Sequence, residues 1–415
     1  MKFIADFHLH SKYSRATSRQ MDLENLDKWA RIKGIKVLGT GDFSHPEWFK
    51  SLKEKLEPAE PGLFKIKEQD NGTRFMLTNE ISCIYSKKGR VRKIHILIFA
   101  PSFEIAEKIN VQLSWIGNLK ADGRPILGLD AKELVKIVLN SSQDCLIVLC
   151  HAWTPWFSIF GSKSGFDSIE ECFEDYSKYI YAIETGLSSS PDMNWRLSSL
   201  DKITLISNSD AHSGPKLGRE ANVFDTELSY QSIIEAIKTK NPQKFLYTIE
   251  FFPEEGKYHF DGHRNCQIRL SPKETKKYNG ICPVCGRPLT VGVLNRVEEL
   301  ADREEGFIPE RAIPFKSLVP LEEIIADALG QSTGTKEVEK EYKNLIEKLG
   351  SEFNILLETP PESLPTATLP EISEAIIRVR EGKVVKEPGY DGVYGKIKIF
   401  SPGEQKNLSK QDTLF

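Results

Sequence analysis

The sequence predicts an α/β barrel over residues 1–250, followed by a small cysteine-containing module and a mainly helical C-terminal region. Short apolar runs alternate with helical segments in the first part, which is typical of strands connected by helices. Polar residues with ligating side chains follow these runs at their C-terminal ends. In a barrel those ends converge on one rim, whereas an open sheet spreads them along an edge. A barrel is therefore the expected architecture.

Seven apolar runs are the expected strands, at residues 3–7, 36–38, 75–78, 94–100, 146–150, 179–183 and 203–206. Segments with helical spacing lie between several of them, at 22–34, 131–139 and 230–240. The first places Leu23, Leu26 and Trp29 on one face and ends at Gly34, a common helix terminator. Repeated strand–helix alternation predicts a parallel sheet.

The rest of the chain divides into three parts. Residues 251–295 are short segments punctuated by Gly and Pro, and they contain clustered cysteines. Residues 296–400 have helical patterns at 321–329, 336–349 and 371–381, followed by a β-like stretch at 392–400. Residues 401–415 have too little apolar surface to fold alone, so we expect a disordered tail.

Composition limits the class of protein. The 415 residues are 40% hydrophobic and 28% charged, which suits a globular chain of two or three domains and excludes a mostly disordered one. No apolar run approaches the ~18 residues that a membrane helix needs, so no membrane partner is expected. Seven cysteines and an N-terminus unlike a signal peptide favour the cytoplasm. A net charge of −3 means that any nucleic acid must be bound by local patches.

Two short motifs indicate metal binding. The segment Asp-Phe-His-Leu-His at 6–10 places His8 and His10 two residues apart at a strand end, so both rings can reach one ion. The segment Asp-Ala-His at 210–212 repeats the arrangement after the last expected strand. Further strand ends add one ligating side chain each, at Glu80, His95 and His151. A core histidine would explain one such position, but hardly five strand ends of one sheet.

These motifs resemble the polymerase and histidinol phosphatase (PHP) family over about residues 1–245. The resemblance implies a distorted (β/α)7 barrel that holds up to three metal ions. It implies a first ion at His8, His10, Glu80 and Asp210, a second at Glu80, His95 and His151, and a third at His212. The family's Thr-Asp-His motif is Gly-Asp-Phe at 41–43, and Arg15 stands where a further histidine is common. Asp42 and His45 are therefore the expected substitutes at the third ion.

The implied ligands predict hydrolysis of a phosphoester. Mixed imidazole and carboxylate ligands suit Zn²⁺, Mn²⁺ or Fe ions, with Mg²⁺ as a further candidate. Two ions bridged by a carboxylate lower the pKa of a shared water and clamp an in-line displacement. Glu80 and Asp210 are thus the expected catalytic carboxylates. Asp192, in a polar loop after another strand, is a candidate acid or base, with helix capping as the alternative.

A second metal site is expected in the cysteine-containing module. His263 and Cys266 form an H-x₂-C pair, and Cys282 and Cys285 form a C-x₂-C pair. This spacing suits one structural zinc ion, because each pair lies on a tight turn and contributes two ligands. His259 is the alternative to His263 as the histidine ligand.

Longer stretches extend the resemblance to nearly the whole chain. Residues 39–43, 184–187, 258–266, 279–286, 296–303 and 389–396 together are similar to the endonuclease Q family. The resemblance implies a PHP barrel joined to a zinc finger and a helical C-terminal domain, which nicks DNA on the 5′ side of uracil, hypoxanthine, xanthine and abasic sites. Two other functions stay open. One is a small-molecule phosphatase, which leaves residues 251–415 unexplained, and the other is a nucleic-acid-binding module with an inactive barrel.

Several residues are candidates for binding damaged DNA. Five cations precede the histidine of the 94–100 run and could meet phosphates near the ions, namely Lys87, Lys88, Arg90, Arg92 and Lys93. A solvated hairpin tip is the alternative. Trp153 and Trp156 could stack on an extruded base, with core packing as the alternative. Asn194 could read a base edge, and Arg196 beside it is a further DNA-binding candidate.

The last five residues, Gln-Asp-Thr-Leu-Phe, are similar to the Gln-x-x-Leu-Phe motif by which bacterial replication and repair proteins bind the sliding clamp. Gln411 would hydrogen-bond in one subpocket, while Leu414 and Phe415 fill an apolar one. Two large apolar residues at the end of a polar segment have nothing local to bury them, which favours a binding motif. A tail folded back on the C-terminal domain is the alternative.

Overall fold

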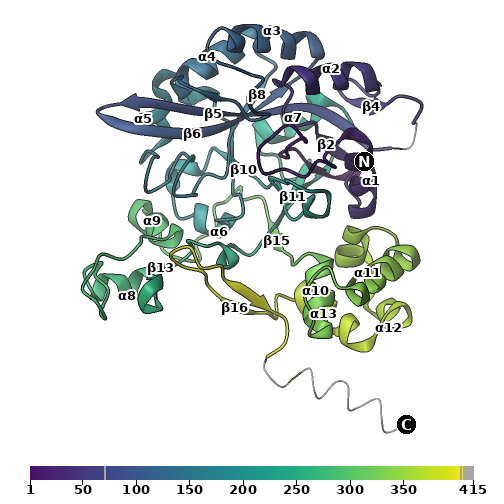
Figure 1. The fold of residues 1–415 in the computed structure, drawn as a ribbon, viewed down its shortest axis with the longest axis vertical. Helices are drawn as coiled ribbons and strands as arrows, with labels where there is room; N and C mark the ends of the chain where they lie inside the picture. Colours follow the sequence, from purple (N-terminus) through teal and green to yellow (C-terminus); the bar gives the residue numbers. More distant parts are fainter. Residues whose placement is uncertain (70–71, 402–403, 405–415) are drawn as a thin grey trace.

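The structure, a computed structural model, describes residues 1–69, 72–401 and 404. A curled sheet wrapped by helices forms the upper part of Figure 1. A small module with α8 (Pro272–Lys277) and a helical bundle with α10 (Leu321–Leu329) lie below it. A hairpin of β16 (Val385–Glu387) and β17 (Lys396–Lys398) runs between these two (Figure 1). The predicted fold class, a distorted barrel followed by a small module and helices, is confirmed.

The barrel is formed by one sheet. Its strands follow the order β10 (Thr204–Ile206), β9 (Ala182–Glu184), β8 (Leu146–Leu149), β6 (Arg90–Ala100), β5 (Arg74–Lys87), β2 (Val37–Gly39), β1 (Lys2–Asp6), β11 (Ala221–Asp225), β12 (Phe245–Glu250) and β15 (Phe315–Ser317). Short strands attached to it are β3 (Leu56–Pro58), β4 (Phe64–Ile66) and β7 (Ile126–Leu127). All seven expected strands are present.

The sheet is mixed, so the prediction of a parallel sheet is wrong for part of it. The pairs β1–β2, β2–β5, β8–β9 and β9–β10 are parallel. The strands β5 and β6 instead form a long antiparallel hairpin, and β1 is antiparallel to β11. Lys88 and Gly89 at the hairpin tip both have positive φ, 51° and 73°. Such a two-residue turn joins antiparallel strands directly, without the crossover that a parallel pair needs.

The barrel closes between β10 and β1 through contacts beyond the ends of these strands. Leu9 and Ala211 form an isolated parallel bridge. The side-chain oxygen of Asn208 accepts a hydrogen bond from the Phe7 N–H at 2.9 Å. The rim segments that follow β1 and β10 are therefore held side by side.

The helices that cover the sheet are α1 (Leu23–Lys33), α2 (Pro46–Lys55), α3 (Phe103–Ser114), α4 (Ala131–Ser141), α5 (Ile169–Phe173), α6 (Pro191–Asn194) and α7 (Tyr230–Thr239), with 3-10 turns η1 (Glu174–Tyr179), η2 (Ser198–Leu200), η3 (Gly214–Lys216) and η4 (Pro253–Glu255). Helix α1 confirms the expected segment. Asp22 caps it by accepting a hydrogen bond from the Asn25 N–H, and Gly34 ends it with a φ of 88°. A Cβ at Gly34 would also lie 2.4 Å from Ser351 of the helical bundle.

The small module contains β13 (Asp261–His263), η5 (Arg264–Cys266), β14 (Ile268–Leu270) and α8, and it is followed by α9 (Val293–Leu300). Strand β15 then returns to the barrel and pairs with β12, so the segment 296–400 is not wholly helical. The bundle consists of α10, α11 (Lys336–Leu349), η6 (Asn354–Glu358), η7 (Pro361–Ser363), α12 (Leu364–Ala367) and α13 (Pro370–Arg380). Helices α10 and α11 match the expected 321–329 and 336–349. No helix within the described ranges is long and apolar enough to cross a membrane.

Candidate metal centre

Ligating side chains from separate strands meet at the rim of the barrel. They are His8 and His10 after β1, Glu80 in β5, His95 in β6, His151 after β8 and Asp210 after β10. Their ligand atoms form two groups, each within 4.8 Å, namely His8–His10–Glu80–Asp210 and Glu80–His95–His151. Glu80 belongs to both groups, which is the arrangement that the PHP resemblance implies.

Two of these ligands lie on strained backbone. His151 has a φ of 31° and Asp210 a φ of 47°. Residues with a Cβ rarely adopt the left-handed region, and such strain is concentrated at functional sites because the surrounding structure must hold it in place.

The first group fits a metal ion by its unsatisfied atoms. Nε2 of His10 lies 3.2 Å from Oε2 of Glu80 and 3.1 Å from Oδ1 of Asp210. In spite of these short separations, His8 Nε2, His10 Nε2 and Asp210 Oδ1 are buried without a hydrogen-bond partner among the residues that the structure describes. Unpartnered buried polar atoms cost free energy unless a ligand satisfies them, and imidazole nitrogen with carboxylate oxygen suits a transition-metal ion. This group could therefore hold a metal ion.

In the second group, His95 and Glu80 have the protonation states that metal ligands need. Nδ1 of His95 lies 2.6 Å from Oε1 of Glu80, and Nε2 of His151 lies 3.2 Å from the same oxygen. Burial lowers the pKa of His95 to about 4 in spite of the nearby Glu80, so its imidazole is neutral at pH 7. Burial alone would raise the pKa of Glu80, but His95, Arg124 and His8 outweigh it and hold that pKa well below its ordinary value. Glu80 is therefore an ionised carboxylate.

Glu184 at the end of β9 supports the first group from behind. Both of its carboxylate oxygens lie 3.0 Å from Nδ1 of His8, and it accepts hydrogen bonds from the His151 backbone N–H and from Asn208. A carboxylate at the far ring nitrogen fixes the tautomer of a metal-binding histidine and leaves its Nε2 free for the ion. The strand-end pattern includes Glu184, but this supporting role was not predicted.

The structure does not support Asp42 and His45 as ligands of a third ion. Oδ1 of Asp42 faces Nδ1 of His10 at 3.1 Å, and Oδ2 accepts the Ser11 N–H at 2.6 Å. Asp42 is therefore occupied in orienting His10, as Glu184 orients His8. His45 occupies the N-cap position of α2 without a side-chain capping hydrogen bond, and its ring stacks on Tyr13, with ring centroids 4.4 Å apart.

His212 lies at the edge of the first group. Its ring centroid is 4.5 Å from that of His10, and its Nδ1 lies 2.9 Å from the carbonyl oxygen of Asp210. It is not part of either ligand group within the described residues, so its assignment to a third ion stays a prediction.

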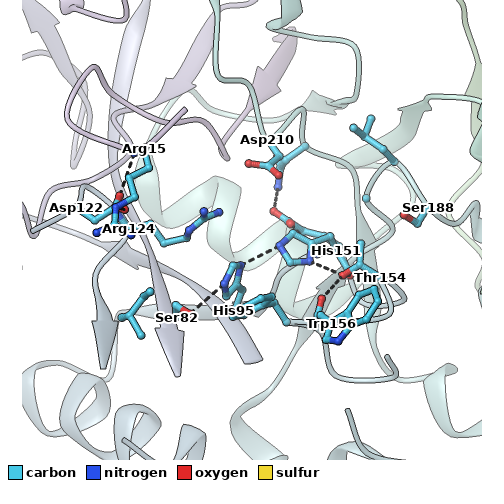
Figure 2. Close-up of a pocket in the computed structure, with 16 residues that line it drawn as sticks. Arg15, Ser82, His95, Asp122, Arg124, His151, Thr154, Trp156, Ser188 and Asp210 are labelled. Carbon is cyan, nitrogen blue, oxygen red and sulfur yellow. Dashed lines mark hydrogen bonds and ion pairs between the residues drawn. The ribbon is translucent and has the colours of Figure 1, made fainter. Parts of the chain in front are cut away.

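A cavity of about 460 Å³ opens over the ligands (Figure 2). Arg15, Asp122 and Arg124 form one side of it, and Trp156 and Ser188 lie on the opposite side. Arg124 donates from Nη1 to Oε2 of Glu80 at 3.2 Å. Arg124 was not predicted, because its loop has no periodic pattern. The available signal is an arginine in an Asp-Gly-Arg-Pro turn.

The two tryptophans of the rim loop differ. Trp156 lines the cavity and is 42% exposed, so it stays a candidate for stacking on a base. Trp153 and Asn194 are buried, and Nε1 of Trp153 donates to Oδ1 of Asn194 at 2.7 Å. The expectation that these two contact DNA is wrong, because each satisfies the other inside the core.

Asp192 and Arg196 also have structural positions. Asp192 is exposed in the first turn of α6, outside both ligand groups and the cavity lining, and it accepts a hydrogen bond from Ser190. This placement favours a role at the helix N-terminus over acid–base catalysis. Arg196 donates to Glu298 of α9 at 2.6 Å, so it joins the barrel to α9 rather than offering a free cation to DNA.

Two of the five hairpin cations, Lys87 and Arg92, have side chains that are largely withdrawn from solvent. Arg92 is 5% exposed and lies over the ring of Phe166, 4.0 Å from its centroid. Lys87 forms an ion pair with Glu174 at 2.8 Å. Burial of Arg92 contradicts its expected contact with DNA, whereas the contact of Lys87 with DNA stays a prediction.

The other three hairpin cations stay candidates for DNA contact. Lys88 and Arg90 are exposed at the tip of the hairpin. Lys93 lies on the same face of β6 as His95, with its ammonium 5.2 Å from the ring centroid of Phe157.

The small module brings its four predicted ligands together. The ligand atoms of His263, Cys266, Cys282 and Cys285 lie within 4.8 Å of one another, and the group does not include His259. Burial raises the pKa of the Cys282 thiol, but hydrogen bonds from the backbone N–H groups of Cys285 and Val284 outweigh it and lower that pKa to about 6. A thiolate is the form that binds metal, so this group could hold zinc. The predicted clamp-binding residues Gln411, Leu414 and Phe415 lie outside the described residues.

Comparisons with known proteins agree with this fold. The structure resembles that of the lesion-specific endonuclease PfuEndoQ from Pyrococcus furiosus, with a TM-score of 0.86 and 31% identity over 100% of both chains. It also resembles endonuclease Q in complex with a 27-mer duplex that has an abasic lesion at the active site, with a TM-score of 0.84 and 32% identity over 97% of this chain and 98% of that one.

Two sequence matches extend these comparisons. The MJ0043 C-terminal domain family matches residues 320–383. An uncharacterised protein, MJ0043 of Methanocaldococcus jannaschii, is 35% identical over 274 residues, which are 64% of this chain and 33% of that protein. The curled sheet and its rim of imidazoles and carboxylates define a PHP-type barrel enzyme. Given the full-length matches, the chain belongs to the endonuclease Q family.

Proposed function

We propose that the protein is a DNA-repair endonuclease that hydrolyses the phosphodiester on the 5′ side of deaminated bases (uracil, hypoxanthine and xanthine) and of abasic sites. The observation that carries the proposal is the pair of ligand groups that share Glu80 beside an open cavity. The full-length relative with an abasic-lesion duplex at its active site supports the substrate.

The proposed cofactors are two or three divalent ions of Zn, Mn, Fe or Mg in the barrel and one structural zinc in the module. When bound, paired ions lower the pKa of a water and neutralise charge on a phosphate. Glu80 and Asp210 would provide carboxylate oxygens as ligands of the ions. Glu184 and Asp42 fix the orientation of the His8 and His10 rings, respectively.

Damaged DNA is proposed to lie across the mouth of the cavity. Lys88, Arg90 and Lys93 would contact phosphates, and Trp156 would stack on the extruded nucleotide. A second cavity of about 300 Å³ supports this role of Trp156, because it shares Trp156 with the first and is also lined by Tyr258 and Tyr394.

The proposed organisation keeps the four expected parts, 1–250, 251–295, 296–400 and 401–415, with β15 assigned to the barrel. All seven cysteines are free, which supports action in the cytoplasm.

A nicking assay tests the function. Duplexes that contain one uracil, hypoxanthine, xanthine or abasic site should be cut on the 5′ side of the lesion, and an undamaged duplex should stay intact. Addition of a chelator should stop cleavage, and divalent ions should restore it. Equal cleavage of undamaged DNA would contradict lesion recognition, and release of phosphate from small phosphoesters alone would favour a phosphatase.

The tail motif is proposed to bind the replication sliding clamp. Removal of residues 411–415 should abolish binding to a purified bacterial clamp and leave nicking of short duplexes unchanged. A Gln411→Ala variant should weaken binding in the same direction. Equal clamp binding by truncated and intact proteins would refute this partner.

A further inference from the structure

We infer that Arg124 is a catalytic residue that binds a non-bridging oxygen of the scissile phosphate. The inference rests on the proposed phosphodiester hydrolysis and names a substrate contact within the same site. It starts from one position: the guanidinium touches the carboxylate that both ligand groups share.

The loop that carries Arg124 is fixed against the site by its backbone. Immediately after it, β7 pairs with β5, with Ile126 opposite Ser82, and the Ser82 N–H donates to the Pro125 carbonyl at 3.1 Å. Ser82 is two residues from Glu80, so it lies on the same face of β5. The loop cannot move away from the ligands without breaking this pairing.

Gly123 brings the loop close on its other side. A Cβ at this position would lie 2.3 Å from Oδ2 of Asp42, the carboxylate that orients His10. The Gly123 N–H also donates to the Tyr13 carbonyl at 3.1 Å. Glycine is therefore required here, and it places the next residue, Arg124, directly above the ligand groups.

The guanidinium faces the cavity with unused donors. Within the described part of the chain, its side-chain hydrogen bond is the one from Nη1 to Glu80, at 3.2 Å. The side chain is 26% exposed and lines the cavity, and Figure 2 shows it reaching from the Asp122 loop toward His95. An arginine has five N–H donors in a planar fork that matches a phosphate. Nε and Nη2 thus stay available on the side where a substrate would lie.

Charge also favours this role. Arg124 is a permanent cation, whereas the imidazoles around Glu80 must be neutral to bind ions. A phosphate held by ions at both ligand groups would lie beside Glu80 and hence within reach of Arg124. A fixed donor aimed at charge that develops in the transition state accelerates the reaction more than it strengthens binding.

The rival explanation is that Arg124 only holds Glu80 in place. Arg15 offers a matched control, because it is a cation on the same side of the cavity, pairs with Asp122 at 3.3 Å, and has a 74% exposed side chain. Within the described structure it forms no hydrogen bond or ion pair with Glu80, so it contributes charge without the geometry.

The test combines variants with sulfur substitution at the scissile phosphate of an abasic-site duplex. Arg124→Met should lower single-turnover nicking by ~10²–10³-fold, the usual effect of removing one such donor. For one phosphorothioate diastereomer, sulfur and Arg124→Met together should slow nicking by much less than the product of their separate effects. Both changes remove the same contact, so the second has little left to remove. For Arg15→Met, the decrease in nicking rate should be the product of the separate effects of the substitution and of sulfur, in both diastereomers.

Fully multiplicative effects of Arg124→Met with both diastereomers would overturn the proposal. Metal content by mass spectrometry gives a second readout that does not depend on activity, and it should be unchanged in Arg124→Lys. Loss of metal from Arg124→Lys, which keeps the charge, would show that Arg124 acts by holding Glu80. Absence of nicking by the wild-type protein on any lesion would instead refute the proposed function, so the two failures are distinguishable.

Discussion

The barrel and the small module each gather potential metal ligands, but in opposite ways. The barrel ligands are spread from residue 8 to residue 210 and meet at the rim of a sheet with two large buried apolar clusters. The module ligands lie within residues 263–285, and the buried cluster beside them consists of Leu270, Cys282 and Leu289. The barrel has a large apolar core of its own, so a metal there should supply chemistry. The small cluster of the module includes one of the ligands, so a metal there should supply folding free energy.

The largest effect on activity should come from Asp210→Asn, which keeps the size of the side chain and removes its charge. We expect nicking to fall by about 10³-fold or more, because ion-based charge stabilisation is worth several kcal/mol and each 1.36 kcal/mol is tenfold. The melting temperature should stay within about 4 °C of wild type, the shift that about 1 kcal/mol produces. Single-turnover nicking and calorimetry check both results. Unfolding of this variant would contradict the independence of the barrel from its metal.

Cys282→Ser should have the opposite profile. We expect loss of about one zinc equivalent and rapid hydrogen exchange over residues 258–290, because structural zinc contributes much of the folding free energy of such a small cluster. The barrel amides should keep their protection. The control is Cys145→Ala, a buried cysteine of the barrel, which should retain the zinc. Protection of the module in the zinc-free variant would show that its apolar contacts suffice.

The same contrast explains what the sequence predicts well. The ligand groups are predictable because strand alternation and the H-x-H and D-x-H spacings place side chains at one rim, and the H-x₂-C and C-x₂-C pairs are local. Asp42 looked like a ligand because it is the aspartate of a family motif whose other two positions differ here, but its oxygens face His10 and Ser11. That distinction depends on rotation about two bonds, which a sequence does not encode.

The other differences depend on which face of a segment is buried. Arg92 shares a face of β6 with Ile94 and Ile96, so alternation along the strand predicts its burial. Trp153 and Asn194 come from separate loops that pack together, and no local pattern indicates this. Arg124 reaches the site because β7 pairs with β5, a contact between segments with no periodic signal.

Glu184→Gln sharpens the comparison by testing support of the barrel ligands without removing one. We expect 10–100-fold weaker metal binding, because the neutral amide no longer holds the His8 ring as strongly in its metal-binding tautomer. Titration of the metal-free protein with Mn²⁺ measures it. The matched control is Asp192→Asn, an exposed carboxylate in the next helix, which should change affinity by less than about twofold, as surface changes away from a site usually do. A larger effect of Asp192→Asn would restore its role at the site.

The smallest expected effect is on stability alone. It concerns a buried pair of acidic residues, whose cost in folding free energy the large apolar core of the barrel can tolerate and the module could not. The β11–β12 register pairs Ala221 with Ile249, so Glu220 and Glu250 lie opposite each other. Both are buried, and in the described structure Glu220 Oε2 and Glu250 Oε1 have no hydrogen-bond partner. Like charges at opposed positions of a sheet are destabilising. This pair therefore makes the stability of the barrel depend on pH.

Glu250→Gln should remove much of that dependence. Burial raises the pKa of Glu250 from 4.5 to about 7, so between these values the folded protein keeps a proton that the unfolded chain has lost. Stability should therefore fall as the pH rises through this range, by up to about 3 kcal/mol. The amide cannot ionise, so the variant and the wild type should melt at similar temperatures at pH 5, and the variant should melt several degrees higher at pH 8, at about 2–4 °C per kcal/mol. The exposed Glu227→Gln change serves as control and should leave the pH profile unaltered. If Glu250→Gln keeps the full slope of wild type, the pH dependence arises elsewhere and the buried pair is not a source of it.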